Sequence, residues 1–153
     1  MRQHSPPTRG ITNHRDKRDD EGYHGGVGLT HIRARIANPA RPRRTASVRF
    51  LVDSGAVYSV VPAPILRRLG IQAHSSRTFI LADGTEITRG VGDATFVIDG
   101  QRAASPVIFG EKDDAALLGT VSLESLGLVL DPMKRILRPL PMVLGHLRPP
   151  RRI

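Results

Sequence analysis

Apolar and polar residues alternate along much of the chain, which predicts β-strands with one buried face. In residues 29–37, Ile32, Ala34 and Ile36 alternate with arginines, and residues 47–52 repeat the pattern. Residues 58–61 and 117–119 predict short apolar strands, and residues 38–46 a turn-rich loop. The remaining strands are predicted in pairs around a turn, in residues 77–88, 94–109 and 128–140. In the first two pairs the turn is Asp-Gly, a strong hairpin signal.

Two segments predict short helices among these strands. Residues 62–70 begin with prolines and end at Gly70, which suits a left-handed cap. Residues 120–127 end in the same way at Gly127. The predicted fold class is therefore mostly β, a closed β barrel with two short helices.

Polarity divides the chain into three parts. Residues 1–26 carry mixed charges and almost no aliphatic side chains, so we expect a disordered polar and basic arm. Residues 27–142 hold every predicted element and form one domain. Residues 143–153 are expected to be a basic C-terminal tail.

Composition narrows the chemistry. The chain has no Cys, which excludes disulfides and a thiol nucleophile, and its histidines show no metal-ligand spacing. We therefore expect no metal and no cofactor. There is no apolar leader and no run long enough to cross a membrane, so the expected location is cytoplasmic.

The net charge of +9 could favour nucleic acid. However, aromatic residues make up only 4% of the chain, and the arginines follow no helical stripe. We therefore favour a solvated basic surface over a nucleic-acid site.

The segment 51–62, LVDSGAVYSVVP, places Asp53 between two apolar runs. By itself Asp-Ser-Gly is more typical of an ordinary turn than of a catalytic site. Its context changes this interpretation, because an apolar strand precedes it, a strand and a helix follow, and a hairpin and Leu117-Leu118-Gly119 come later. This order, over about residues 27–142, resembles the retropepsin-like aspartic proteases, particularly small single-domain bacterial members.

The resemblance implies a closed acid-protease barrel and gives residues roles. Asp53 would be the catalytic aspartate, in an active-site loop with Ser54, Gly55 and Ala56, where Ser54 would hydrogen-bond beneath the two active-site loops. The flap would be Leu81, Ala82, Asp83, Gly84 and Thr85. The residues expected to line the cleft are Val57, Tyr58, Ile80, Leu117, Leu118 and Gly119.

The chain holds one such motif, whereas this chemistry needs two carboxylates. The other aspartates lack the apolar-Asp-Ser/Thr-Gly context. We therefore expect a homodimer in which a two-fold axis places Asp53 of one copy opposite Asp53 of the other. The expected activity is aspartic endopeptidase cleavage of a polypeptide, with water activated between the two carboxylates.

Two departures from the retroviral pattern keep alternatives open. Val57 and Thr120 stand where retroviral members commonly carry an Asp and an Arg. Loss of that ion pair would favour a weak or inactive peptide-binding module of the same fold. A basic nucleic-acid-binding β barrel, using Arg41, Arg43, Arg44 and the C-terminal arginines, is a third hypothesis.

Overall fold

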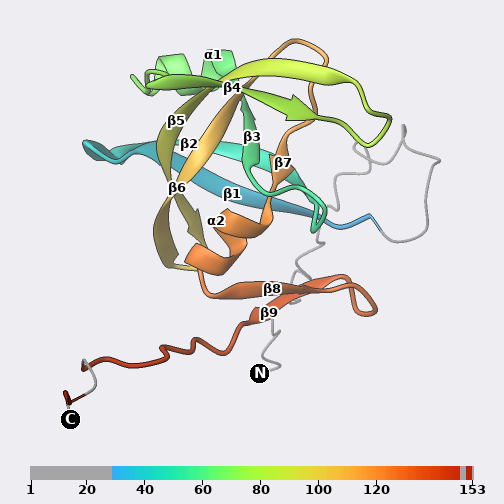
Figure 1. Ribbon diagram of the computed structural model, residues 1–153. Helices are drawn as coiled ribbons and strands as arrows, with labels where there is room; N and C mark the ends of the chain where they lie inside the picture. Colours follow the sequence, from blue (N-terminus) through green and yellow to red (C-terminus); the bar gives the residue numbers. More distant parts are fainter. Residues whose placement is uncertain (1–28, 149–150, 153) are drawn as a thin grey trace, which may run out of the picture.

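The computed structural model describes residues 29–148, 151 and 152; the predicted arm of residues 1–26 lies outside this part of the chain. Figure 1 shows strands wrapped around a central core, with two short helices against them. The elements are β1 (His31–Asn38), β2 (Arg41–Val52), β3 (Ser59–Pro62), α1 (Ala63–Arg68), β4 (Ser75–Ile80), β5 (Glu86–Ile98), β6 (Gln101–Gly110), β7 (Leu117–Leu118), α2 (Thr120–Ser125), β8 (Leu128–Asp131) and β9 (Ile136–Pro139).

Strand pairing closes the main sheet on itself. The order is β1-β2-β7-β3-β6-β5-β4, and β1 also pairs with β5. Six strands therefore form a ring, while β4 pairs with β5 and extends from it as a hairpin. This ring agrees with the predicted closed barrel with two short helices.

The inward positions of the alternating strands build a mainly aliphatic core that also holds three phenylalanines, Phe50, Phe96 and Phe109. Phe50 of β2 and Phe96 of β5 are fully buried, with ring centroids 6.0 Å apart. Ile36, Val61 and Leu118 are also fully buried. The core is thus assembled from strands far apart in sequence, and apolar burial on this scale is the main favourable term in folding.

The predicted turns and helix ends are confirmed. Asp99 and Gly100 both have positive φ, as a two-residue hairpin turn requires. Gly70 and Gly127 have φ of 76° and 68° directly after α1 and α2, where a side chain would be strained.

The predicted loop at residues 38–46 is wrong for most of its length. β2 begins at Arg41, and only a short turn separates it from β1. Thr45 and Ala46 pair with Ala37 and Ile36 of β1, and the register then shifts before Asn38 pairs with Arg41. Because the irregularity leaves residue 42 outside the register, a proline is tolerated there.

After α2 the chain forms the separate β8–β9 hairpin, which agrees with the predicted strand, turn and strand. Beyond β9, residues 143–148 form no helix or strand, and their side chains are exposed. Figure 1 shows this segment running away from the barrel. Among the described residues, every helix is too short or too polar to span a bilayer.

Candidate active site

Asp53 lies directly after β2, where the chain turns sharply. Its backbone N–H donates to the carbonyl of Leu118 at 3.0 Å, which ties the end of β2 to β7. The N–H of Gly55 donates to Asp53 Oδ1 at 2.9 Å, an Asp-type turn. A Cβ at residue 55 would lie 3.2 Å from that same oxygen, so Gly55 leaves room for the carboxylate.

The active-site loop and the two residues after it, together residues 53–58, are hydrogen-bonded through their backbone to the start of α2. The N–H groups of Thr120 and Val121 donate to the carbonyls of Ala56 and Val57 at 2.9 and 3.0 Å. Thus Val57 and Thr120, the two departures from the retroviral pattern, stand in segments joined by backbone hydrogen bonds. Gly119 packs so closely that an added Cβ would lie 2.6 Å from the carbonyl carbon of Tyr58.

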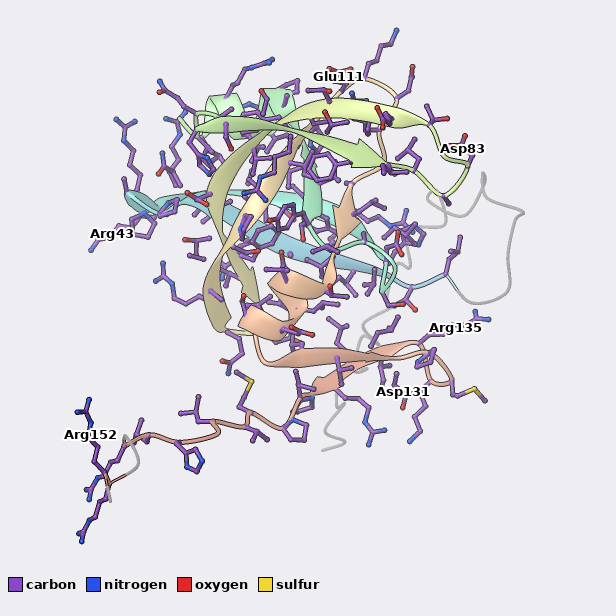
Figure 2. All side chains as sticks on the ribbon, in the orientation of Figure 1. Arg43, Asp83, Glu111, Asp131, Arg135 and Arg152 are labelled. Carbon is purple, nitrogen blue, oxygen red and sulfur yellow. The ribbon has the colours of Figure 1, made fainter. Side chains whose placement is uncertain are left out.

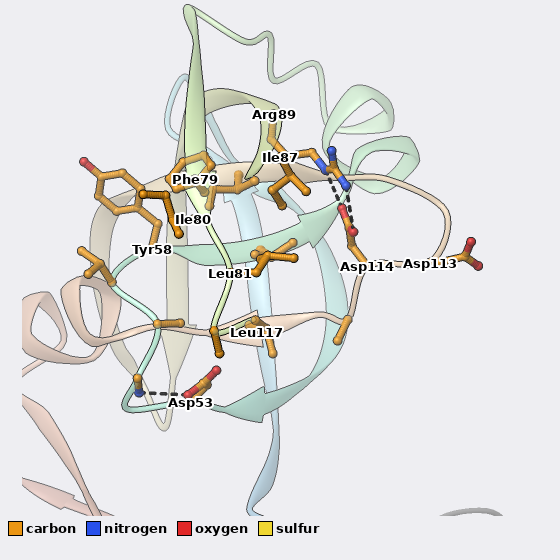
Figure 3. A pocket seen from close by; sticks show the side chains of 17 residues that line it. Asp53, Tyr58, Phe79, Ile80, Leu81, Ile87, Arg89, Asp113, Asp114 and Leu117 are labelled. Atoms are coloured by element: carbon orange, nitrogen blue, oxygen red, sulfur yellow. Dashed lines mark hydrogen bonds and ion pairs between the residues drawn. The ribbon is translucent and has the colours of Figure 1, made fainter. Parts of the chain in front are cut away.

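A cleft of about 810 Å³ opens beside this loop. Figure 3 shows Asp53 at one end of it, with Leu81 and Leu117 between Asp53 and the far end. The lining is mainly apolar, as expected of a site for extended peptide. It comprises Asp53, Gly55, Ala56, Val57, Tyr58, Val60, Phe79, Ile80, Leu81, Ala82, Ile87, Arg89, Ile108, Asp113, Asp114, Ala115 and Leu117.

The predicted flap is the loop between β4 and β5. Leu81 N–H donates to the Thr85 carbonyl at 2.8 Å, and Thr85 N–H donates to Asp83 Oδ1 at 2.9 Å. The Thr85 N–H stabilises the carboxylate and lowers the pKa of Asp83 below its usual value. Leu81 and Ala82 line the cleft, while all five residues of the loop are exposed.

A bidentate ion pair forms the end of the cleft opposite Asp53. Arg89 of β5 donates from Nε and Nη2 to Asp114 at 2.7 and 3.1 Å, shown as dashed lines in Figure 3. The Arg89 guanidinium lowers the pKa of Asp114, and the Asp114 carboxylate raises the pKa of Arg89. In the same view the neighbouring Asp113 side chain points away from the cleft.

Tyr58 connects the active-site loop to the flap hairpin. Arg77 of β4 donates from Nη1 to the Tyr58 hydroxyl at 2.6 Å, and its guanidinium carbon is 5.6 Å from the ring centroid. Phe79 packs edge-on against the same ring, with centroids 6.2 Å apart. The base of the hairpin is therefore fixed on the wall of the cleft.

The predicted site residues fall into three groups. Most of them lie together in the cleft lining, and Leu118 and Gly119 are buried behind it. The exposed residues that are not part of the lining are Ser54, Asp83, Gly84 and Thr85. Successive residues of a strand face opposite sides, so Leu117 faces the cleft and Leu118 is fully buried in the core. Ser54 is exposed beside Asp53, and its hydroxyl makes no hydrogen bond within residues 29–148.

The sequence prediction missed several cleft residues on β3 to β6 and on the segment before β7. Phe79 and Ile87 are directly paired across the hairpin and so share its cleft face. Their alternation was visible in the sequence and could have identified them. Arg89 and Asp114 are 25 residues apart, and nothing local in the sequence indicates that they pair.

The arginines of the nucleic-acid hypothesis do not gather on one surface. Arg41, Arg43 and Arg44 are exposed near the turn between β1 and β2, and Figure 2 shows Arg43 far from Arg152. In the part of the chain that the structure describes, no three His, Asp or Glu side chains are placed to share a metal ion.

A family model described as "Aspartyl protease" matches residues 33–121, which include Asp53, the flap and β7. The chain belongs to the aspartyl protease family. The resemblance drawn from the sequence is confirmed at this level. A comparison with curated proteins finds no match.

The solved structures that are similar to this chain include three of low sequence identity. Simian foamy virus (mac) protease in solution is 21% identical, covers 59% of this chain and 87% of its own, and has a TM-score of 0.41. EIAV protease complexed with the inhibitor HBY-793 is 16% identical, with coverages of 80% and 99% and a TM-score of 0.49. A retropepsin-like aspartic protease from Rickettsia conorii is 23% identical, with coverages of 68% and 77% and a TM-score of 0.46.

Proposed function

We propose that this aspartyl protease family member is an endopeptidase that works as a homodimer, with Asp53 from each copy forming the catalytic pair. The observation that carries the proposal is the arrangement of carboxylates along the cleft. Among the described residues the cleft wall holds three, of which Asp114 is bound to Arg89 and Asp113 points away. Among the described residues, the Asp53 carboxylate accepts a hydrogen bond only from the backbone N–H of Gly55.

One carboxylate cannot both remove a proton from the attacking water and donate a proton to the scissile carbonyl. An ionised Asp53 takes a proton from a bridging water, while a protonated carboxyl group donates a hydrogen bond to the scissile carbonyl. As water adds, that carboxyl group stabilises the developing oxyanion by giving up its proton. The proton removed from water then goes to the leaving amine. The second carboxyl group has to come from a second copy of the chain.

Electrostatic repulsion between two neighbouring carboxylates favours a state in which they share one proton. Two carboxylates about 4 Å apart at an effective dielectric constant near 20 repel each other by about 4 kcal/mol, which is about three pK units. One carboxylate is therefore protonated and the other ionised over a mildly acidic range. The two pKa values belong to the pair rather than to either residue.

The proposed substrate is a polypeptide in an extended conformation. Val57 is 61% exposed and Ile80 is 74% exposed, although both are apolar and line the cleft. Burying such surface against a ligand is favourable. We therefore expect apolar side chains next to the cleaved bond.

The deciding experiment compares cleavage of an unfolded protein at mildly acidic pH by the native chain and by Asp53→Asn. The substitution keeps the shape of the side chain and removes its proton chemistry. Loss of general acid–base catalysis should reduce the rate by on the order of 10²–10⁴-fold. Asp99→Asn is the matched control, because Asp99 occupies a hairpin turn and is not part of the cleft lining. Equal cleavage by the native chain and Asp53→Asn would contradict the proposal.

Sedimentation tests the dimer independently. The native chain should associate in the concentration range where it cleaves, and cleavage per chain should rise with concentration as dimers form. A chain that stays monomeric at high micromolar concentration and still cleaves would refute the two-copy mechanism.

A peptide-binding module without activity is the second candidate function. It is favoured by Val57 and Thr120, because two uncharged side chains cannot form an ion pair between the segments that flank Asp53. Binding of an apolar peptide by both the native chain and Asp53→Asn, without cleavage by either, would support it.

A further inference from the structure

Three serine hydroxyls lie in the core directly behind the active-site loop. Ser59 begins β3, Ser105 is in β6 and Ser122 is in α2, and all three are buried. Ser122 Oγ is 2.6 Å from Ser59 Oγ and 2.7 Å from Ser105 Oγ. Buried polar groups cost stability unless they are paired, so a connected set at this place needs a reason.

Either hydroxyl of each serine pair can be the donor, but one direction gives every proton of this set an acceptor. Each hydroxyl has a single proton to donate. In that direction Ser105 donates to the carbonyl of Pro106, 3.3 Å away, and accepts the proton of Ser122. Ser122 accepts the proton of Ser59. Ser59 Oγ in turn accepts the N–H of Gly119 at 2.9 Å.

The chain of donors therefore starts at the backbone that holds Asp53. Gly119 lies between Leu118, whose carbonyl accepts the Asp53 N–H, and Thr120, whose N–H donates to Ala56. The serine chain fixes this segment to β3, β6 and α2 at once. Because all its links point the same way, the bonds polarise and strengthen one another.

We propose that Ser122 is a positioning residue: as the central link of the Ser59–Ser122–Ser105 chain, it holds residues 118–121 in place and thereby sets the position of Asp53. This inference rests on the proposed function of Asp53. Ser122 touches no substrate, because it is fully buried and is not part of the cleft lining.

Ser122→Ala tests the inference. It leaves the Ser59 hydroxyl without an acceptor and Ser105 without a donor, so the loop should lose its fixed position. We expect kcat to fall about tenfold, the effect of losing roughly one buried hydrogen bond in the transition state, while KM stays within about twofold. Ser122→Cys, whose thiol is a weak donor and acceptor, should restore part of kcat.

The pH profile separates positioning from simple loss of stability. A loosened loop lets the two Asp53 carboxylates move apart, so their repulsion weakens and their two apparent pKa values approach each other. The pH range of activity of Ser122→Ala should therefore narrow from both sides.

Ile36→Val removes a methylene group from the core on β1, away from the serine chain, and serves as a control of lowered stability. It should leave the pH range unchanged.

Three outcomes would overturn the inference: kcat and a pH profile for Ser122→Ala that match those of Ile36→Val, no recovery in Ser122→Cys, or an equal loss in Ser105→Ala. Ser105→Ala removes only the last link and should have a smaller effect. If Ser122→Ala does not fold, kcat and the pH profile are compared between Ser122→Cys and Ser105→Ala instead. The change should be larger in Ser122→Cys, because Ser122 is the central link, and an equal or smaller change would overturn the inference.

Amide hydrogen exchange keeps this inference separate from the proposed function. In Ser122→Ala the amides of Gly119 and Asp53 should exchange faster, whereas in Ile36→Val they should not change relative to other core amides. This result does not depend on cleavage. If the native chain does not cleave, the proposed function fails, while unchanged exchange in Ser122→Ala defeats the positioning role.

Discussion

Asp53 and Asp83 begin the same kind of turn in two loops of the same cleft. In each, the carboxylate accepts the backbone N–H of the residue two positions later, Gly55 or Thr85, at 2.9 Å. The two aspartates are thus locally equivalent.

Their surroundings differ. The backbone of the Asp53 loop bonds to Leu118, Thr120 and Val121, which are distant in sequence. The Asp83 loop is closed by bonds among residues 81–85. A catalytic carboxylate has to be held in position, whereas a flap has to move over a substrate. The long-range bonds, rather than the turn itself, distinguish the two loops.

Gly119→Ala should have the largest effect on this difference. An added Cβ would lie 2.6 Å from the carbonyl carbon of Tyr58 and 2.8 Å from the carbonyl oxygen of Val57. Because both are backbone atoms, the loop itself has to shift. Overpacking typically costs about 1–3 kcal/mol, and because this contact is so short we expect the free energy of unfolding measured in urea to fall by about 3 kcal/mol, the upper end of that range. Cleavage should be lost with it.

The control for this variant is Gly145→Ala, since no atom in the described part of the chain lies within 4 Å of a Cβ at residue 145. It should leave the urea midpoint unchanged. If Gly119→Ala unfolds at the native midpoint and cleaves at the native rate, the loop is not held by residues 118–121.

The sequence predicted what is decided locally. The Asp-Gly turns, the glycine caps at Gly70 and Gly127, and the alternating strands depend on neighbouring residues, and the structure agrees with each. The strand at residues 41–46 was missed because Pro42 and the arginines favour a loop, whereas pairing with β1 outweighs this preference. Strand preference of this kind depends on context.

What could not be predicted depends on contacts between distant segments. The Asp53 turn and the Asp83 turn look alike in the sequence, and the support from residues 118–121 exists only in the folded barrel. Ser59 and Ser105 occupy inward positions of their strands, where an apolar residue is usual. That pattern could have indicated a buried polar pair, but not that Ser122 joins them.

Asp114→Asn tests the base of the flap hairpin, where Arg89 of β5 forms a long-range ion pair with Asp114. The Arg89 guanidinium lowers the pKa of Asp114 from 3.8, so the ionised pair stabilises the fold. A depressed pKa adds stability above the unfolded pKa, and this stability is lost as the pH falls through the folded pKa. At pH 7 the variant should unfold at a lower urea concentration than the native chain, with a smaller loss of stability than that of Gly119→Ala.

The difference between the native chain and Asp114→Asn should start to shrink below about pH 4, where Asp114 of the unfolded chain takes up a proton. It should be lost only once the pH has fallen through the lowered pKa of Asp114 in the folded chain, because the carboxyl group is then uncharged in both states. Asp113→Asn is the neighbouring control, since Asp113 is exposed and forms no ion pair among the described residues. A gap for Asp114→Asn that is constant from pH 3 to pH 7 would show that the ion pair adds no stability.

Gly84→Ala should have the smallest effect on stability. Gly84 has φ of 85°, which strains an alanine, but no described residue has an atom within 4 Å of its Cβ position. Strain of about 1 kcal/mol is partly offset by the lower entropy of the unfolded chain, so the free energy of unfolding should fall by less than about 1 kcal/mol.

Gly100→Ala is the matched control, with φ of 79° and equally open space in the β5–β6 turn. Both should unfold alike, while KM should rise only for Gly84→Ala, because only that loop borders the cleft. A loss of stability in Gly84→Ala as large as that of Gly119→Ala would mean that the flap loop, too, is held by distant parts of the barrel.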